Sequence, residues 1–191
     1  HARNIKRGRG AGLQVRRTTD PDACQEHARL VRASMIRRES RGDVVPRDID
    51  VRTYLALTQS GAGNLFQAIL AGEVVSSALI LLAERGAYYQ SAGTSSEGMA
   101  CGASHFLVYA TADALRQQSL ELFNLGGADR FIPGLERFKT GFGATKVELE
   151  EAEFFLGSKL RRNLGTAASL LHRNRSRFLA QVLGRYERFV S

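Results

Sequence analysis

Long apolar segments and cysteine clusters are both missing from this 191-residue sequence. Its longest apolar run, residues 74–83, contains two serines and ends at Glu84, well short of the length that a membrane-spanning helix needs. The two cysteines, Cys24 and Cys101, give neither a metal-ligand spacing nor a disulfide framework. We therefore interpret both as small buried apolar residues, predict no metal site, and expect a reducing, cytoplasmic location.

Internal repeats, low-complexity segments and a secretion signal are missing as well. Residues 1–9 are basic but lack the apolar centre of a signal peptide. With 43% hydrophobic and 24% charged residues, the chain fits one globular domain with a sizeable core, or such a domain with an appendage.

Positive charge is concentrated at the two ends of the chain, whose net charge is +8. Residues 1–17 carry six Lys or Arg and no acid, and residues 157–191 carry eight Lys or Arg and one Glu. The middle of the chain is mildly acidic by comparison. Basic ends of this kind can attract phosphate, nucleic acid or anionic lipid, and they can equally be solvated helix faces.

Hydrophobic periodicity predicts alternating strands and helices. We expect a strand over 13–17, a helix over 21–40 with Asp20 as its N-cap, and a second helix after Pro46 that ends near Gly61. Three β-rich runs joined by turn-like connections predict an antiparallel meander, which we place at 64–71, 74–83 and 87–91. The rest of the pattern predicts a loop over 93–104, a helix over 103–118, a strand over 120–125, a short helix over 133–140 and a strand over 144–149.

Three parts of the chain are expected: a basic lead-in over 1–12, a main domain over 13–156 and a basic amphipathic helical tail over 157–191. In the tail, an apolar stripe lies among arginines and includes Leu160, Leu164, Leu171, Phe178 and Val182. Such a helix can lie in an anionic membrane interface, or it can pack on the domain or on a second subunit. The lead-in could follow a missing N-terminal domain, and an isolated half would then tend to self-associate as a homodimer.

The predicted order of elements resembles the GNAT acyltransferase fold, and three motifs narrow the resemblance. "AYYQSAGTSSE" (87–97), "LELFNLGG" (120–127) and "PGLERFKTGFGA" (133–144) are similar to segments of the FemABX peptidyltransferases and the BioF2-like acyltransferases. The resemblance covers roughly four-fifths of the chain. It implies an α/β fold of the α+β sandwich type: a mixed central sheet with an antiparallel meander, flanking helices and a basic C-terminal helical extension.

Two departures from the family pattern bear on the site. Asn124 stands where these families usually have an acid, so this position supplies no negative charge. The pyrophosphate signature of ordinary GNAT enzymes, Gln/Arg-x-x-Gly-x-Gly/Ala, is not clean, because neither Gly98 nor Gly102 has Gln or Arg three residues before it.

The motif around Lys139 gives the main candidate site. Gly126 and Gly127 would let the backbone approach a ligand, while Phe138 and Phe142 would anchor a short helix that holds Lys139 on its opposite side. A fixed ammonium beside bare backbone suits a phosphate or the oxyanion of acyl transfer. The alternative is that Gly126 and Gly127 only end a strand and that Lys139 is a solvated charge.

The resemblance therefore implies a set of site residues. The predicted catalytic residues are Lys139 and Asn124, the substrate-binding residues are Tyr89, Gly126, Gly127, Phe138 and Gly141, and the cofactor-binding residues are Gly102, Ala103 and Ser104, whose N–H groups begin a helix. Tyr88 and Tyr89 should face opposite sides of their strand. We consider Glu97 as a base and His105 as a catalytic residue, but an exposed glutamate and a histidine at the edge of the core are the commoner outcomes.

The function implied by the resemblance is transfer of an acyl or aminoacyl group to an amine. The co-substrate would be acyl-CoA or aminoacyl-tRNA, with no tightly bound cofactor, and tRNA would be a partner in the second case. A role in cell-envelope biosynthesis, at the inner face of the membrane, would suit the basic tail. The alternative is a non-catalytic GNAT-like module that binds nucleic acid or anionic membrane through its basic ends.

Overall fold

A five-stranded mixed sheet organises the computed structural model, which describes residues 1–43, 45, 50–127 and 133–148. The strands are β1 (Gln14–Thr18), β2 (Gly63–Leu70), β3 (Glu73–Leu82), β4 (Gly86–Thr94) and β5 (Leu122–Asn124), in that order across the sheet. β1 to β4 are antiparallel neighbours, and β5 runs parallel to β4. The expected mixed sheet with an antiparallel meander is therefore confirmed.

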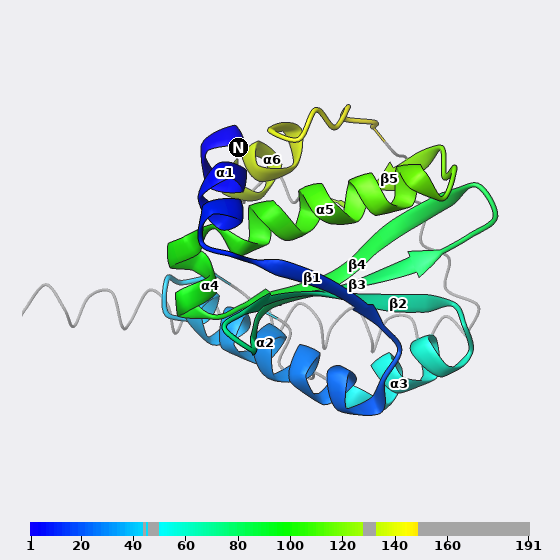
Figure 1. Ribbon diagram of the computed structural model, residues 1–191, viewed down its shortest axis with the longest axis horizontal. Helices are drawn as coiled ribbons and strands as arrows, with labels where there is room; N and C mark the ends of the chain where they lie inside the picture. The colour runs from blue at the N-terminus through cyan, green and yellow to red at the C-terminus, as the bar shows by residue number, and fades with distance from the viewer. Residues whose placement is uncertain (44, 46–49, 128–132, 149–191) are drawn as a thin grey trace, which may run out of the picture. The chain divides into compact units, whose positions relative to one another are not determined.

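Helices cover both faces of this sheet (Figure 1). They are α1 (Ala2–Gly10), α2 (Pro21–Glu39), α3 (Val51–Gln59), α4 (Ser96–Cys101), α5 (Ala103–Gln117) and α6 (Pro133–Thr140). α2 and α3 lie on one face, whereas α5 lies on the other with α1 packed beside it. No helix in the described part of the chain is both long and apolar enough to cross a membrane.

Alternating side chains divide the core into two layers, one on each face of the sheet. On β2, Phe66 belongs to the layer shared with α5, whereas Leu65 belongs to the layer shared with α2 and α3. The α5 layer is the larger and includes Ile80, Leu107 and Leu115. Cys24 is fully buried in the second layer, as the sequence predicted.

A completely buried histidine ties α2 to the sheet. His27 makes hydrogen bonds of 2.9 Å from one ring nitrogen to Ser77 Oγ on β3 and from the other to Ser91 Oγ on β4. Its ring also packs edge-on against Tyr54 of α3, with the centroids 4.7 Å apart. Burial lowers the pKa of His27 to about 4, so the imidazole is neutral in the folded protein at ordinary pH.

Three segments differ from the sequence-based expectation. The loop expected over 93–104 contains α4, which begins where the Ser95 side chain accepts a 3.0 Å hydrogen bond from the N–H of Gly98. The described part of the strand expected over 144–149 forms no strand, and Lys146 in this segment pairs at 3.4 Å with Glu136 of α6. Most of the expected basic lead-in is helix α1, which packs on α5 with Gly8 against Phe106.

Residues up to Lys146 form one unit, and residues 147–191 form a second. The basic tail expected over 157–191, together with the boundary at 156, lies outside the described residues.

The buried imidazole predicts a pH dependence of stability. Unfolded His27 takes up a proton near its ordinary pKa of 6.5, whereas the folded protein resists protonation down to about pH 4. Lowering the pH from 6.5 to 4 should therefore reduce the free energy of unfolding by about 3 kcal/mol through this residue, while stability above pH 6.5 is unaffected by it. Urea unfolding at several pH values should show this loss in the wild type and a shallower dependence in His27→Gln. The same pH dependence of the free energy of unfolding in both proteins would contradict its assignment to His27.

Candidate active site

The parallel pair of strands β4 and β5 opens partway along its length. β5 pairs with β4 only from Gly86 to Tyr88, whereas β4 continues to Thr94. A β-bulge at Gln90 marks the start of the unaccompanied part, since Leu79 and Ile80 of β3 pair with Ser91 and Tyr89. Within the described residues, the outer edge of β4 beyond Tyr88 therefore has no strand partner, and its backbone groups face the opening.

Helix α2 closes the far end of this open edge. The N–H of Thr94 donates to Ser34 Oγ at 3.0 Å, and the Thr94 carbonyl accepts from the Arg37 guanidinium. Burial lowers the pKa of Arg37, and the charge of nearby Arg41 lowers it further. α2 comes so close that a Cβ on Gly93 would lie 2.1 Å from the carbonyl carbon of Leu30. The open edge is thus limited to residues 89–93, with two guanidinium groups near its end.

Gly126 lies at the other end of the opening, two residues after the end of β5. The side-chain oxygen of Asn124 accepts a 2.8 Å hydrogen bond from the Gly126 N–H, which turns the chain at a φ of +76°. A Cβ on Gly126 would lie 3.4 Å from the Tyr88 hydroxyl oxygen, 3.4 Å from the Tyr89 carbonyl oxygen and 3.6 Å from Lys139 Nζ. Asn124 therefore shapes the turn, and Gly126 is the point where the candidate groups meet.

Lys139 reaches this point from α6. Its ammonium donates to the carbonyl oxygens of Gly126 at 2.9 Å and of Gly127 at 2.6 Å. Burial lowers the pKa of Lys139 below its ordinary value. An ammonium has three N–H donors, and the contacts to described residues use two of them, which leaves one for a ligand. The predicted grouping of Lys139, Asn124, Gly126 and Gly127 is present in the structure.

The two tyrosines of β4 face opposite sides of the sheet. Tyr89 packs against the core layer under α5, and burial raises its pKa. Tyr88 is 39% exposed, with its hydroxyl beside Gly126. The alternation was predicted, but the Tyr89 side chain points into the core, and it is Tyr88 whose hydroxyl faces the turn. Tyr89 contributes only its carbonyl there. Strand periodicity alone cannot tell which side a helix will cover.

The N–H cradle expected at the start of α5 is not formed as predicted. The N–H of Gly102 donates to the Met99 carbonyl at 3.3 Å, because α4 runs directly into α5. Ala103 is fully buried in the core. α1 lies against the same turn, where a Cβ on Gly102 would come within 2.7 Å of the Asn4 carbonyl oxygen. Of the three predicted residues, Ser104 alone is neither buried nor engaged in this junction.

Phe138 and Gly141 lie away from the Gly126 turn. The Phe138 ring packs edge-on against His105 and against Phe142, with centroids 5.0 and 5.2 Å apart. Gly141 faces the ring of His1, and there is no room for a Cβ between them. Both residues take part in the attachment of α6, and their contact with substrate stays a prediction. Glu97 is exposed in the first turn of α4.

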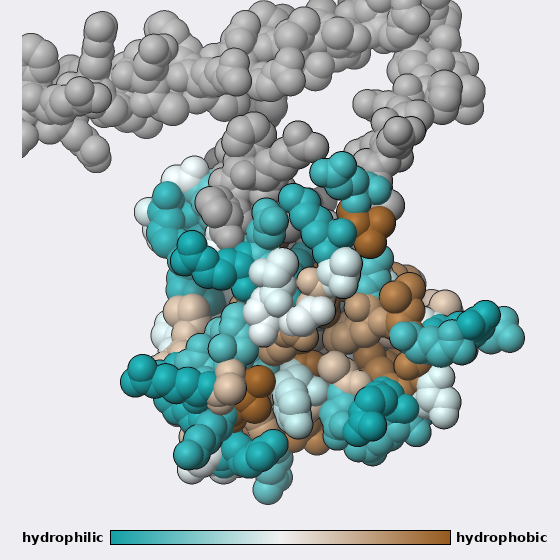
Figure 2. Space-filling view, turned by 90° about the horizontal axis from the view of Figure 1, so that it is seen from above, coloured by the Kyte–Doolittle hydropathy of each residue, from teal (hydrophilic) through white to brown (hydrophobic). Residues whose placement is uncertain are grey.

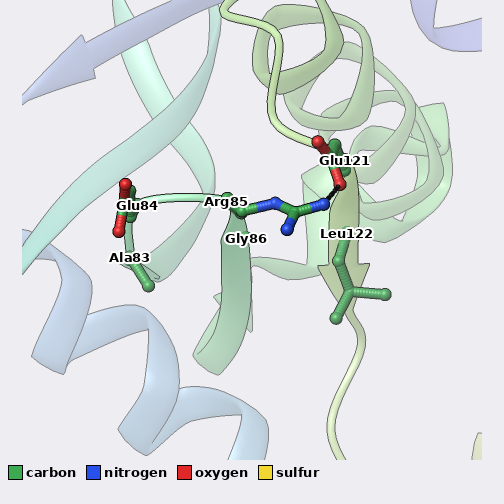
Figure 3. A pocket seen from close by; sticks show the side chains of 6 residues that line it. All are labelled: Ala83, Glu84, Arg85, Gly86, Glu121 and Leu122. Atoms are coloured by element: carbon green, nitrogen blue, oxygen red, sulfur yellow. Dashed lines mark hydrogen bonds and ion pairs between the residues drawn. The ribbon is translucent and has the colours of Figure 1, made fainter.

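A shallow depression lies at the starts of β4 and β5 (Figure 3). It is lined by Ala83, Glu84, Arg85, Gly86, Glu121 and Leu122, and an ion pair joins Arg85 to Glu121. None of the predicted site residues lines it. From the side that carries α1, α5 and α6, hydrophilic side chains rim an apolar area of the described surface (Figure 2). The described residues contain no cluster of His, Cys, Asp and Glu able to hold a metal ion.

Comparison with known families and structures gives a consistent result. The family described as "Acetyltransferase (GNAT) domain" matches residues 1–140. None of the curated proteins matches the sequence. Solved structures with the same fold include a possible acetyltransferase from Clostridium difficile 630, with 13% identity, a TM-score of 0.60, and coverage of 76% of this chain and 99% of that one.

Two further structures are similar in the same way. One is an aminoglycoside acetyltransferase from an uncultured soil metagenomic sample, in complex with sisomicin; it has 18% identity and a TM-score of 0.55, and the match covers 77% of this chain and 97% of that one. The other is a predicted acetyltransferase with acetyl-CoA from Clostridium acetobutylicum, with 12% identity, a TM-score of 0.55, and coverage of 75% and 96%. At these identities the likeness establishes the fold.

The positive φ of Gly126 predicts that a side chain at this position strains the turn. Gly126→Ala should lower the free energy of unfolding by about 1 kcal/mol, because an L-residue with a Cβ is strained at this φ. Gly127→Ala is the matched control, since a Cβ there meets nothing within 4 Å and its φ is ordinary. Denaturant unfolding of both variants checks the prediction, and equal effects would contradict the assigned turn.

Proposed function

Because the chain belongs to the acetyltransferase (GNAT) domain family, we propose that it transfers an acyl group from acyl-coenzyme A to the amine of an acceptor. The observation that carries this proposal is the opening between β4 and β5, with Lys139, Tyr88 and the Gly126 turn at one end. Acyl transfer from a thioester needs hydrogen-bond donors that stabilise the oxyanion and a surface that positions the extended donor molecule. Fixed donors beside an exposed strand edge can meet both needs.

The open edge of β4 suits the donor. Residues 89–93 present roughly 15 Å of strand edge, along which the amide groups of an extended arm can pair as an added strand would. Arg37 and Arg41, near the end of this edge, suit the phosphates at the other end of coenzyme A. The acetyl-CoA in the Clostridium acetobutylicum structure supports this donor by analogy. We therefore favour acyl-CoA over aminoacyl-tRNA.

The chemistry assigns a role to each group at the Gly126 turn. The neutral amine attacks the thioester carbonyl carbon, and the oxygen becomes an oxyanion in the tetrahedral intermediate. The remaining N–H of Lys139 would stabilise that charge. Collapse breaks the carbon–sulfur bond, and the departing thiolate takes a proton from the Tyr88 hydroxyl. The proton released by the amine restores Tyr88 through solvent, so the products are an amide and a free thiol.

Asn124 and the Gly126–Gly127 backbone act indirectly in this scheme. The Asn124 side chain fixes the turn through the Gly126 N–H, and the two glycine carbonyls hold the Lys139 ammonium. A neutral amide is sufficient for this work, so the acid usual at this position in FemABX-like sequences is not required.

A donor screen with matched lysine variants tests the proposal. Release of free coenzyme A thiol from acetyl-CoA and longer acyl-CoAs is measured with a panel of amines. Lys139→Met should lower kcat by about 100-fold or more, because one oxyanion donor is lost. Lys146→Met is the control, since Lys146 is exposed and pairs only with Glu136 among the described residues. Unchanged turnover in Lys139→Met would remove Lys139 from the mechanism.

A non-catalytic module is the second candidate, and one observation favours it. α1 covers the turn at Gly102, where the sequence pattern predicted a phosphate cradle. Thermal shift separates the two candidates. Stabilisation by an acyl-CoA supports the enzyme, whereas no response to any donor, together with salt-sensitive binding of RNA or anionic vesicles, supports the module.

The proposal also covers the acceptor, that is, the molecule whose amine receives the acyl group. The similarity of residues 120–144 to FemABX segments supports an amine on a cell-envelope precursor. The basic tail over 157–191 would then bring the enzyme to the inner face of the membrane. Sedimentation with anionic liposomes, with and without residues 157–191, tests this part. Equal binding by both forms, or by neither, removes the anchor from the proposal.

A further inference from the structure

Helix α6 carries Lys139 and, among the described residues, is attached to the rest of the unit through Lys139 and Phe138. It is eight residues long, too short to hold its position without tertiary contacts. Lys139 itself reaches the carbonyls of Gly126 and Gly127 from one side. On the other side, Phe138 and Phe142 pack edge-on against each other and project toward α5. The position of the ammonium therefore depends on what these two rings meet.

The rings meet two imidazoles, that of His105 on α5 and that of His1. The His1 ring centroid lies 5.7 Å from that of Phe138 and 4.5 Å from that of Phe142, and His1 Nε2 donates to the Phe138 carbonyl oxygen at 2.7 Å. The side chain that connects the two phenylalanine rings to α5 is His105. Its imidazole lies edge-on to Phe138 at a centroid distance of 5.0 Å and tilted to Phe142 at 6.0 Å. His105 Nε2 accepts a hydrogen bond from Asn4 Nδ2 at 3.3 Å, because an amide nitrogen can only donate. The Asn4 oxygen in turn accepts from Arg7 at 3.0 Å. His105, which also packs edge-on against the His1 ring at 4.6 Å, thus contacts both α1 and α6 from its place on α5.

The neutral form of His105 is the form that this arrangement needs. Its Nε2 must carry a lone pair to accept from Asn4, and a charged ring would be costly among phenylalanines. Burial lowers the pKa of His105, and nearby positive charge, including that of Arg7, lowers it further. The hydrogen bond from Asn4 of α1 therefore fixes the orientation of the His105 ring, and this ring packs against Phe138 of α6.

We propose that His105 is a positioning residue for acyl transfer, which holds the Lys139 ammonium against the Gly126 turn through its contact with Phe138. The proposal rests on the role of Lys139 in the proposed function. Lys139 follows Phe138 directly in sequence, so a shift of the Phe138 ring moves the ammonium with it. A displacement of about 1 Å at a group that stabilises a transition state can cost about 100-fold in rate.

The kinetic test uses four single variants of the full chain, Lys139→Met among them, and one double variant. His105→Leu keeps side-chain volume but removes the ring, and should lower kcat at least about tenfold with KM for both substrates within about twofold. His105→Phe restores the ring and should recover most of kcat. Tyr109→Leu, an exposed ring one turn further along α5, is the matched control and should leave kcat unchanged.

The double variant separates positioning from a general structural effect. In a Lys139→Met background, His105→Leu should cause no further loss of kcat, because the group that it positions is already gone. Multiplicative losses, or a failure of His105→Phe to recover activity, overturn the proposal. Thermal midpoints are measured beside each rate, so that loss of fold is recognised.

A second measurement remains decisive if the wild type transfers no acyl group. The pKa of Lys139 is followed by NMR titration of isotope-labelled protein. His105→Leu should raise it toward its ordinary value, since release of α6 exposes the ammonium to water, whereas His105→Phe and Tyr109→Leu should leave it in place. An unchanged Lys139 pKa in His105→Leu overturns the positioning role. If the Lys139 pKa rises in His105→Leu but the wild type shows no turnover, the positioning role stands and the proposed enzyme function is contradicted.

Discussion

The polar edge of strand β4 is the constraint on which the rest of this structure depends. A strand buried on both faces still has backbone N–H and carbonyl groups along its edge, and these need partners. β5 supplies them as far as Tyr88, and Ser34 with Arg37 of α2 supplies them at Thr94. The five residues between are left open beside the Gly126 turn. A defined gap in strand pairing, bounded by protein on both sides, makes this edge the candidate site.

Closure of that gap at one end requires α2 to approach the sheet very closely. Gly93 permits the approach, and His27 fixes its direction through one serine on β3 and one on β4. The face of the sheet under α2 is therefore held by directional hydrogen bonds as well as by a small apolar layer. The face under α5 is held by the larger apolar layer and has to accommodate α6. The two ends of the gap are thus set by different kinds of packing.

The sequence predicted most of the architecture, because period-two and helical patterns are strong in this chain. The strands of the meander, α2, α5 and α6 were placed to within a few residues, and Asp20 was identified correctly as the N-cap position of α2. The convergence of Lys139 with Gly126 and Gly127 was also predicted, because the motif puts bare backbone near a cation. These features are local, and local chemistry determines them.

The sequence-based predictions were wrong where contacts between distant segments determine the structure. α4 was missed because its six residues are mostly small and polar, and only the Ser95 cap identifies it. Tyr89 was assigned to the wrong side because α5 determines which face of β4 is covered. His27 and Ser91 gave no sequence signal, since they are 64 positions apart and meet only through the packing of α2 on the sheet.

The packing of α1 on α5 has a consequence for how the chain is made. Roughly 100 residues separate α1 from its docking site, and β1 must likewise wait for β2 before it can pair. At ribosomal elongation rates of about 5–20 residues per second, the basic N-terminal segment emerges on the order of 5–20 s before its partner helix exists. During that interval its arginines and lysine are exposed on a nascent chain, close to a ribosome rich in phosphate. Burial of Gly8 against Phe106 therefore has to wait for α5, whereas the basic side chains of α1 stay exposed in the folded protein as well, namely Arg3, Lys6, Arg7 and Arg9.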